Sequence, residues 1–344
     1  MPRELVAIAP REPVIREYEL PELQPNQVRV RSQFSAPKHG TELGMYRGTS
    51  AFSRGTWDPE LLIFRRREGE PPGFPMPLGN MAVGIVTEVG AQVTRFKVGD
   101  RVFGHMPIRE VHTVREDRLL PAPEGMSPEA IVYWDPAEFA LGAVRDANIR
   151  LGERVAIFGM GAIGLMAAQM AKLSGAEWLA VVDPLENRRQ AALRHGAHAA
   201  YDPREVDVGE TIKRETGGGV DVAIEASGAY PALHEAIRCT HLCGLVVPLA
   251  FYEGDARGLF LGEEWHMNRI TMRSSRSISD PNRDHPMWHS KRIADYAFQL
   301  LREGRLSVEG LVSPIVPFDE CADAYRRIDE APGESIKLGI VHEQ

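Results

Sequence analysis

The chain has 344 residues, which is too long for one ordinary hydrophobic core and fits two domains of ordinary size. Hydrophobic residues make up 43% and charged residues 26% of it, and no apolar run reaches the roughly 18 residues of a membrane span. The formal net charge of −8 argues against a nucleic-acid partner, whose phosphates demand a basic surface. The start lacks an apolar signal core and the three cysteines are scattered, so we expect a cytoplasmic protein without a membrane or nucleic-acid partner.

The first 140 residues predict a mostly antiparallel β domain. Residues Val28–Arg31 alternate between apolar and charged side chains, Val83–Val89 predict a buried or half-buried strand, and Gly, Pro and Asp interrupt the chain often. Residues 45–77 have no clear hydrophobic period, so we expect a long irregular loop over a cleft. We place this first domain at residues 1–145.

Residues 154–183 contain every part of a dinucleotide-binding βαβ unit in order. The apolar strand Val155–Phe158 is followed by Gly159, Gly161 and Gly164 in the spacing G-x-G-x-x-G. The first glycine permits a tight turn, the second lets the backbone approach the pyrophosphate, and the third lets the following helix pack closely on the sheet. The second strand ends at Asp183, where an acid bridges the adenosine ribose hydroxyls.

These features predict a bound dinucleotide, and the acid at Asp183 favours NAD over NADP, whose 2′-phosphate it would repel. The residues that we expect to contact the cofactor are Gly159, Met160, Gly161, Ala162, Ile163, Gly164, Asp183, Arg188, Ala226 and Ser227.

Six apolar strands alternate with helices from residue 154 onward, which predicts a doubly wound parallel sheet of the Rossmann type over residues 146–280. The predicted strands are Val155–Phe158, Leu179–Val182, Ala199–Tyr201, Val220–Ile224, Leu245–Leu249 and Ile270–Met272. After residue 280, a helix over Ser290–Leu301 and a strand over Ile336–Val341 have no place in that sheet. We expect residues 281–344 to return to the first domain.

Several separate motifs resemble one known group of enzymes over nearly the whole chain. They are Gly40–Leu43, Pro77–Gly84, Phe96–Val102, Asp135-Pro136 and Ile224–Gly228. Together they resemble the medium-chain dehydrogenase/reductase superfamily, which contains the zinc alcohol and polyol dehydrogenases. The resemblance implies a GroES-like catalytic domain, a Rossmann domain and a cleft that holds nicotinamide and substrate. We expect a homodimer or homotetramer that acts on a small molecule.

The sequence departs from this family at the positions of the catalytic zinc ligands. His39 stands at the cysteine position, Asn80 at the histidine position and Met81 at the neighbouring acid, so that only Asp135 keeps a ligand type. The four closely spaced cysteines of the structural zinc loop are also absent. We predict no bound metal; a site made of His39, Asp135 and water is the alternative.

Hydride transfer without zinc needs other groups to stabilise the alkoxide and accept its proton. The candidates are Lys38, His39, Thr41, Glu42 and Asp135. His39 is the first choice as acid or base, against the alternative of a structural histidine, because imidazole titrates near neutrality. Lys38 is either an oxyanion donor or a solvated lysine, and Glu42 is expected in an ion pair. Asn80 and Asp135 have the hydrogen-bonding capacity to bind substrate hydroxyls.

The sequence therefore predicts a zinc-independent, NAD-dependent oxidoreductase that acts on a secondary alcohol of a sugar, polyol or cyclitol. Two alternatives remain at this point. One is an enoyl or quinone reductase of the same superfamily, most of which use NADPH, so Asp183 speaks against it. The other is a nucleotide-binding protein that has lost catalysis.

Overall fold

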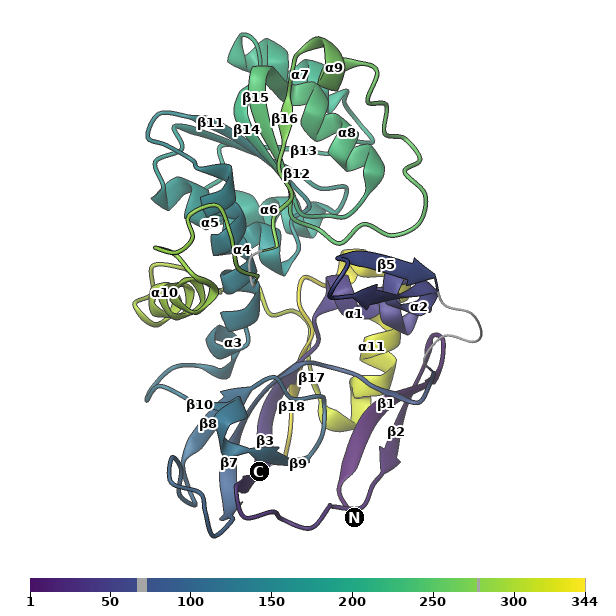
Figure 1. Ribbon diagram of the computed structural model, residues 1–344, viewed down its shortest axis with the longest axis vertical. Helices are drawn as coiled ribbons and strands as arrows, with labels where there is room; N and C mark the ends of the chain where they lie inside the picture. The colour runs from purple at the N-terminus through teal and green to yellow at the C-terminus, as the bar shows by residue number, and fades with distance from the viewer. Residues whose placement is uncertain (67–72, 277–278, 344) are drawn as a thin grey trace. The chain divides into compact units, whose positions relative to one another are not determined.

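The computed structural model describes residues 1–66, 73–276 and 279–343, and the chain forms two compact units (Figure 1). The first unit contains Met1–Val132 and Val312–Gln344, and the second contains Tyr133–Leu311. The boundaries differ from the predicted 145/146 and 280/281. Helix α4 (Trp134–Ala147) packs on α5 (Ala162–Leu173) and on α10 (Ser290–Arg302). Residues 133–145 and 281–311, which the sequence analysis placed in the first domain, therefore belong to the second unit.

A seven-stranded sheet dominates the first unit. Its order is β10-β8-β7-β3-β18-β17, and β9 also pairs with β3. The strands are β3 (Gln27–Ala36), β7 (Met81–Val89), β8 (Arg101–Gly104), β9 (Val111–Arg115), β10 (Leu119–Pro121), β17 (Ile315–Pro317) and β18 (Gly339–Val341). Every pairing is antiparallel except that of β17 with β18, which confirms the predicted mostly antiparallel β domain. The pairing of β18 with β3 joins the two ends of the chain.

A smaller sheet and two main helices complete the core of the first unit. The sheet has the order β2-β1-β6, with β1 (Arg3–Ala9), β2 (Glu12–Glu17) and β6 (Met76–Pro77). Helix α1 (His39–Tyr46) and helix α11 (Cys321–Glu330) share an apolar cluster, in which the rings of Tyr46 and Tyr325 meet edge to face at 5.0 Å. A short helix, α3 (Pro128–Ile131), precedes the second unit.

Part of the predicted irregular loop is regular. Helix α2 (Ala51–Arg54) leads into a hairpin of β4 (Gly55–Asp58) and β5 (Ile63–Arg66), while residues 67–72 of the same stretch lie outside the described residues. The prediction is wrong for residues 51–66 because the strands are too short to show a period. The Asp58 carboxylate organises the turn locally by accepting the N–H groups of Glu60 and Leu61.

The second unit is built on a six-stranded parallel sheet in the order β13-β12-β11-β14-β15-β16, which confirms the predicted doubly wound fold. The strands are β11 (Arg154–Phe158), β12 (Trp178–Val182), β13 (Ala199–Tyr201), β14 (Val220–Glu225), β15 (Thr240–Pro248) and β16 (Thr271–Met272). In the register, Phe158 lies opposite both Val182 and Glu225, so these three strands end together at one edge.

Helices connect the strands of this sheet. They are α5, α6 (Glu186–Arg194), α7 (Val208–Thr216), α8 (Tyr230–Cys239) and α9 (Glu264–Met267). Gly175 and Gly196 follow α5 and α6 at φ values of 99° and 103°, a region that favours glycine. The apolar interior includes Ala156, Ile212 and Ile237, all fully buried. The sheet and its helices place the β11, β12 and β14 ends beside one another.

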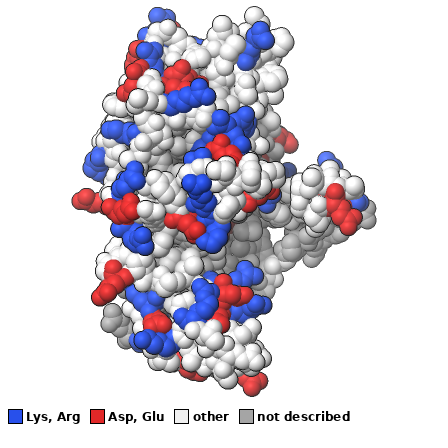
Figure 2. All heavy atoms as spheres, turned by 60° about the vertical axis from the view of Figure 1, so that its left-hand side comes forward, with Lys and Arg blue, Asp and Glu red and all other residues white. Residues whose placement is uncertain are grey.

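The surface carries both signs of charge. On the face shown in Figure 2, the Lys and Arg side chains are interspersed with Asp and Glu side chains rather than gathered into one basic field. Among the described residues, no helix combines the length and the apolar character that crossing a membrane requires.

Candidate active site

The glycine-rich turn has the geometry that its three predicted roles require. Gly159 has φ +87°, and a Cβ there would lie 2.6 Å from Ser227 N. A Cβ on Gly164 would lie 1.9 Å from Gly159 O, so the start of α5 meets the turn with no room for a side chain. A Cβ on Gly161 would meet no atom within 4 Å. The open space therefore lies at Gly161, the glycine at which the sequence predicts that a pyrophosphate approaches the backbone.

The start of α5 can bind an anion. Its N-cap is Gly161, which has no side-chain oxygen to satisfy the first N–H groups, and Ala162 and Ile163 occupy the first turn. Free N–H groups at a helix N-terminus, together with the helix dipole, form a phosphate site.

The Asp183 carboxylate is held against this turn. Its Oδ2 accepts the N–H of Met160 at 2.7 Å and its Oδ1 accepts the N–H of Leu185 at 2.9 Å. The residue is 3% exposed. Because each carboxylate oxygen has a second lone pair, the group can still accept ribose hydroxyls.

Three arginines lie near Asp183. Arg188 Nη1 is 3.9 Å from the Asp183 carboxylate, and burial lowers the pKa of Arg188. Arg189 donates to Asp183 O at 2.8 Å and to Asp202 at 3.0 Å, and Arg204 pairs with Asp202 at 2.6 Å. The hydrogen bond from Arg204 lowers the pKa of Asp202. Asp202 thus balances two of the three guanidinium groups near the end of β12.

A cavity of about 480 Å³ lies along the carboxyl edge of β11, β12 and β14. Its walls include Gly159, Asp183 and Ser227, which were predicted from separate motifs. Ala226 precedes Ser227 and donates its N–H to Phe158 O at 2.8 Å. The predicted cofactor residues at the turn, the acid and the end of β14 therefore lie around one space.

Glu225 is a buried residue at this edge that the sequence analysis did not select. Its carboxylate accepts the N–H of Ser227 at 2.7 Å and of Gly228 at 3.1 Å, as well as the hydroxyls of Ser227 and Tyr252. Burial raises the pKa of Glu225. The contacts fix the turn after β14, and the only sequence signal was an acid directly after the apolar run that ends at Ile224.

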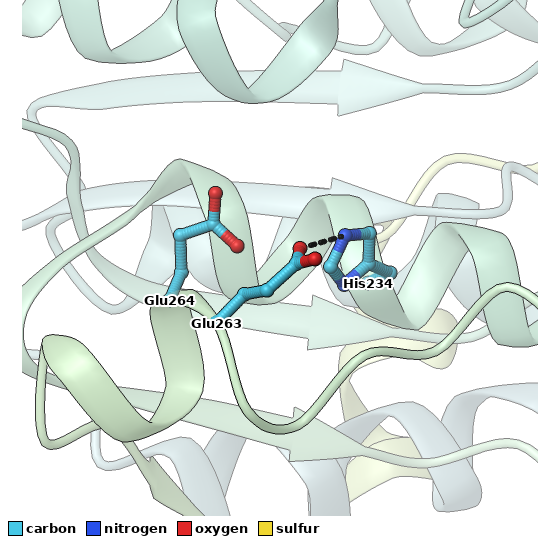
Figure 3. Close-up of side chains that lie close together, drawn as sticks. All are labelled: His234, Glu263 and Glu264. Carbon is cyan, nitrogen blue, oxygen red and sulfur yellow. Dashed lines mark ion pairs between the residues drawn. The ribbon is translucent and has the colours of Figure 1, made fainter.

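His234, Glu263 and Glu264 form a polar cluster in which Glu263 faces His234 (Figure 3). His234 also lines the cavity. His234 Nε2 lies 3.6 Å from Glu263, and possible ligand atoms of the three side chains lie within 4.8 Å of one another. Arg238 Nε stands 3.4 Å from Glu264 and also pairs with Asp207. Because the Arg238 guanidinium already neutralises the charge of Glu264, we assign to the cluster a structural role, in which it holds α9 against α8.

His39 begins α1 in the first unit, and its ring is engaged by the backbone. Nε2 accepts the N–H of Leu338 at 3.0 Å. A backbone N–H is always a donor, so the Nε2 lone pair is committed and the neutral ring carries its proton on Nδ1. In this arrangement the imidazole acts as a hydrogen-bond donor through Nδ1, and accepting a proton at Nε2 requires the Leu338 contact to break.

Glu42 connects two turns of the first unit. Its carboxylate accepts the Tyr325 hydroxyl at 2.7 Å, the Gly79 N–H at 2.5 Å and the Lys38 N–H at 3.3 Å. Burial raises the pKa of Glu42, although these donors and the charge of Lys337 act in the opposite direction. The expected ion-pair role is therefore replaced mainly by hydrogen bonds, which hold the segment around Lys38 against the turn before β7.

Asn80 lies on the turn that Glu42 holds. Gly79 has φ +85°, and a Cβ there would lie 2.4 Å from the Ile108 side chain, so only glycine fits before Asn80. Asn80 Oδ1 is buried without a hydrogen-bond partner among the described residues. The His105 ring approaches the backbone oxygen of Asn80 at 3.3 Å. Asn80 thus presents an acceptor atom that a ligand hydroxyl can satisfy.

The remaining predicted residues divide between the two units. Lys38 is the half-buried N-cap of α1, and Thr41 is exposed in its first turn. Asp135 lies in the first turn of α4, in the second unit, and is 4% exposed. Lys337, which the sequence analysis missed, is buried and donates to Pro37 O at 2.9 Å. Five predicted residues therefore share one region of the first unit, and Asp135 belongs to the other.

Comparisons with known proteins agree with this architecture. A family described as alcohol dehydrogenase GroES-like domain matches residues 25–123, and one described as zinc-binding dehydrogenase matches residues 162–289. D-guloside 3-dehydrogenase of Escherichia coli strain K12 is 40% identical, over 98% of this chain and 99% of its own. The chain belongs to the medium-chain dehydrogenase/reductase superfamily. It is thus a dehydrogenase of the medium-chain superfamily that acts on alcohol groups.

Solved structures show the same fold as this dehydrogenase. The 2R,3R-butanediol dehydrogenase of Bacillus subtilis superposes with a TM-score of 0.78 at 24% identity, over 99% of each chain. A zinc-binding dehydrogenase from Sinorhizobium meliloti 1021, solved with NADP, gives a TM-score of 0.77 at 21% identity, again over 99% of each chain. These likenesses show that the two folds of the chain, the GroES-like domain and the Rossmann-type sheet, occur together in solved dehydrogenases.

Proposed function

We propose that this dehydrogenase transfers hydride between NAD and a secondary hydroxyl of a sugar, polyol or cyclitol, and that it works without catalytic zinc. The observation that carries the substrate class is the 40% identity, along almost the whole chain, to an enzyme named D-guloside 3-dehydrogenase. We further propose that the enzyme is a cytoplasmic homodimer or homotetramer.

The preference for NAD rests on Asp183. Its carboxylate is fixed by Met160 N and Leu185 N beside the cavity, where it would accept the ribose hydroxyls of NAD and repel the 2′-phosphate of NADP. Arg189 and Arg204, which would otherwise attract that phosphate, are bound to Asp202. This balance of charge supports NAD as the cofactor.

The residues at the expected metal positions do not fit a resident zinc. Zinc is held in proteins by thiolate, imidazole nitrogen or carboxylate. His39 commits Nε2 to Leu338, and Asn80 offers an amide oxygen, a weak zinc ligand. The unpartnered Asn80 Oδ1 is instead suited to accept a hydrogen bond from a substrate hydroxyl.

The chemistry then falls to side chains of the chain itself. NAD supplies the hydride acceptor. We assign to the Nδ1–H of His39 and the ammonium group of Lys38 the stabilisation of negative charge on the substrate oxygen. Asp135 takes the hydroxyl proton as the C–H hydride leaves. This assignment moves the proton-acceptor role from His39 to Asp135, because the Leu338 contact supports a donor role for His39.

Turnover of a substrate panel tests the proposal. Purified protein is mixed with NAD and with methyl hexopyranosides, polyols and inositols, and NADH formation is followed by absorbance. We expect turnover with at least one hydroxylated ring substrate and its loss in Asp135→Asn. Reduction of an enone or quinone by NADPH, with no oxidation of any alcohol in the panel, would assign the chain to the reductase branch instead.

A further inference from the structure

A second cavity lies among the helices of the second unit. Its volume is about 660 Å³, which is within the size range of small-molecule sites. Helix α4 packs on α5 and on α10, and residues of all three helices line the cavity (Figure 1). On α5 the lining residues are at the C-terminal end, whereas the glycine-rich turn precedes the N-terminal end. The cavity shares no lining residue with the one beside that turn, so it is a separate candidate site.

Helical spacing brings the lining residues to one face of each helix. On α10 they include Arg292, Tyr296 and Gln299, which follow one another at intervals of four and three residues. On α4 they include Leu141 and Arg145, again four residues apart. Side chains at these intervals lie above one another on the same side of a helix. The regular geometry of the helices therefore directs these side chains into the cavity.

Two aromatic rings hold arginine side chains in this cavity. The Cζ atoms of Arg145 and Arg292 lie 3.6 and 4.1 Å from the centroid of the Trp288 ring. The Tyr296 ring meets the indole edge to face at 5.7 Å, and the Tyr296 hydroxyl accepts a hydrogen bond from Arg305 at 3.4 Å. A guanidinium group that is already held by a ring loses less conformational entropy when it binds a ligand. Three ordered positive charges thus line one cavity.

Two of these arginines lack a close carboxylate partner. Arg145 forms a salt bridge of 2.6 Å with Asp284. The Arg292 guanidinium donates to a backbone oxygen at 2.8 Å, and no ion pair joins it to a carboxylate in the described part of the chain. Arg305 lies 4.0 Å from Glu303, which is the limit of an ion pair. Arg292 and Arg305 therefore have N–H groups that a bound anion can use.

The acidic side chains of the lining are already paired. Asp284 is bound to Arg145, and Asp295 pairs with Lys291 at 2.5 Å. Like charges that are brought close together repel, and a bound anion removes that repulsion. The planar fork of N–H groups on arginine matches the oxygens of a phosphate group. The charges of the cavity therefore favour a phosphate-bearing ligand.

The rest of the lining suits a hydroxylated carbon skeleton. Leu141, Met170 and Leu300 provide apolar wall from three helices, and the side-chain amides of Asn148 and Gln299 provide donors and acceptors for hydroxyls. The cavity is also much larger than a phosphate ion. Two guanidinium groups already contact the indole ring, which disfavours the stacking of a nucleobase there. A sugar phosphate fits this combination better than a nucleotide does.

We propose that this cavity binds a sugar phosphate, with Arg292 and Arg305 binding the phosphate group and the amides of Asn148 and Gln299 binding hydroxyls. The inference goes beyond the proposed function, because none of these residues takes part in the proposed reaction. Since the two cavities are separate, the sugar phosphate and the dinucleotide bind at the same time.

Calorimetric titration of glucose 6-phosphate into the protein saturated with NADH tests this inference. NADH cannot accept hydride, so the sugar is not oxidised, and it competes for any phosphate site at the glycine-rich turn. We expect Arg292→Gln and Arg305→Gln each to weaken binding by about tenfold or more, because each loses charge-assisted hydrogen bonds to phosphate. Arg257→Gln, which changes a side chain that is 90% exposed elsewhere in the second unit, is the matched control and should bind like the wild type.

Three results would overturn the inference. They are no binding of glucose 6-phosphate to the wild type, equal affinity of the wild type and both cavity variants, and binding of inorganic phosphate or AMP as tight as that of glucose 6-phosphate. Arg305 is exposed, so Arg305→Gln should unfold at the same temperature as the wild type and keep the test valid if Arg292→Gln is unstable. The titration does not measure turnover, so its failure leaves the proposed function standing.

Discussion

The two loops that carry the candidate residues, one in each unit, are constructed differently. The turn Gly159–Gly164 is shaped by its own glycines and by the neighbouring strand ends of the second unit. The segment Lys38–Glu42 is shaped by Tyr325, Lys337 and Leu338; the contact of Lys337 with Pro37 spans 300 residues. Local spacing therefore determines the cofactor turn, whereas distant parts of the chain determine what the catalytic side chains can do.

The largest expected effect is a loss of turnover on substitution of His39, a residue whose hydrogen bonding depends on a distant part of the chain. His39→Ala should lower kcat by about 10²- to 10³-fold, the cost of losing a donor to developing oxyanion charge, while NAD affinity stays near normal. His39→Gln keeps an acceptor for Leu338 N–H but loses the Nδ1 donor, so it should resemble alanine in kcat and the wild type in stability. Wild-type kcat in both variants would show that His39 is structural only.

Lowering the pH should lower the free energy of unfolding of the first unit, because two of its histidines are buried. Burial lowers the pKa of His342 from 6.5 to about 4 and that of His112 to about 3. The unfolded chain therefore takes up these protons first, and stability falls as the pH drops from about 6.5 toward 4, by about 3 kcal/mol for His342. Urea unfolding at pH 7 and pH 4.5 measures this.

Two variants isolate the contribution of His342 to the pH dependence of stability. Burial raises the pKa of Glu42 and Glu225, so these groups act in the opposite sense by protonating first in the folded protein. We therefore subtract the pH dependence of the unfolding free energy of His342→Gln from that of the wild type. The contributions of Glu42 and Glu225 cancel in this difference, and the contribution of His342 remains. His266→Gln, at an exposed position of the second unit, should leave the pH dependence unchanged. Identical profiles for all three proteins would contradict the assignment.

Two glycine substitutions test the cofactor turn. Gly164→Ala places a Cβ 1.9 Å from Gly159 O and should lower the unfolding free energy by about 1–3 kcal/mol, as overpacking does, and weaken NAD binding with it. Gly161→Ala meets no atom within 4 Å, so it should keep wild-type stability and lose NAD affinity alone. Thermal unfolding with and without NAD distinguishes them, and loss of stability in Gly161→Ala would contradict the account.

The smallest effect concerns the choice of cofactor. An unpaired carboxylate beside a 2′-phosphate costs about 1.4 kcal/mol, so we expect at least about tenfold tighter binding of NAD than of NADP. Asp183→Ser should narrow this ratio, and Glu186→Gln, at the first residue of α6, serves as the control. Equal affinities of the wild type for both dinucleotides would refute the assignment to Asp183.

The sequence could predict the features that depend on local patterns and could not predict those that depend on contacts between distant residues. The six strands, the tight packing of the glycine-rich turn and the place of Asp183 beside that turn were predictable because periodicity and spacing are local properties. The hydrogen bond from Leu338 N–H to His39 Nε2 could not be predicted, because Leu338 lies at the other end of the chain. Glu225 and Lys337 were missed for the same reason, since only their three-dimensional surroundings separate them from surface charges. The hairpin at residues 55–66 was missed because its short strands give no period.

The most direct test of the central claim is turnover by metal-free protein. Elemental analysis of the purified enzyme, followed by assay with NAD and a responsive sugar or polyol before and after treatment with a strong chelator, measures it. We predict less than about one-tenth equivalent of zinc and unchanged kcat after chelation, because His39 and Asn80 are poor zinc ligands as they are placed. Stoichiometric zinc, with activity that chelation removes and added zinc restores, would contradict the account.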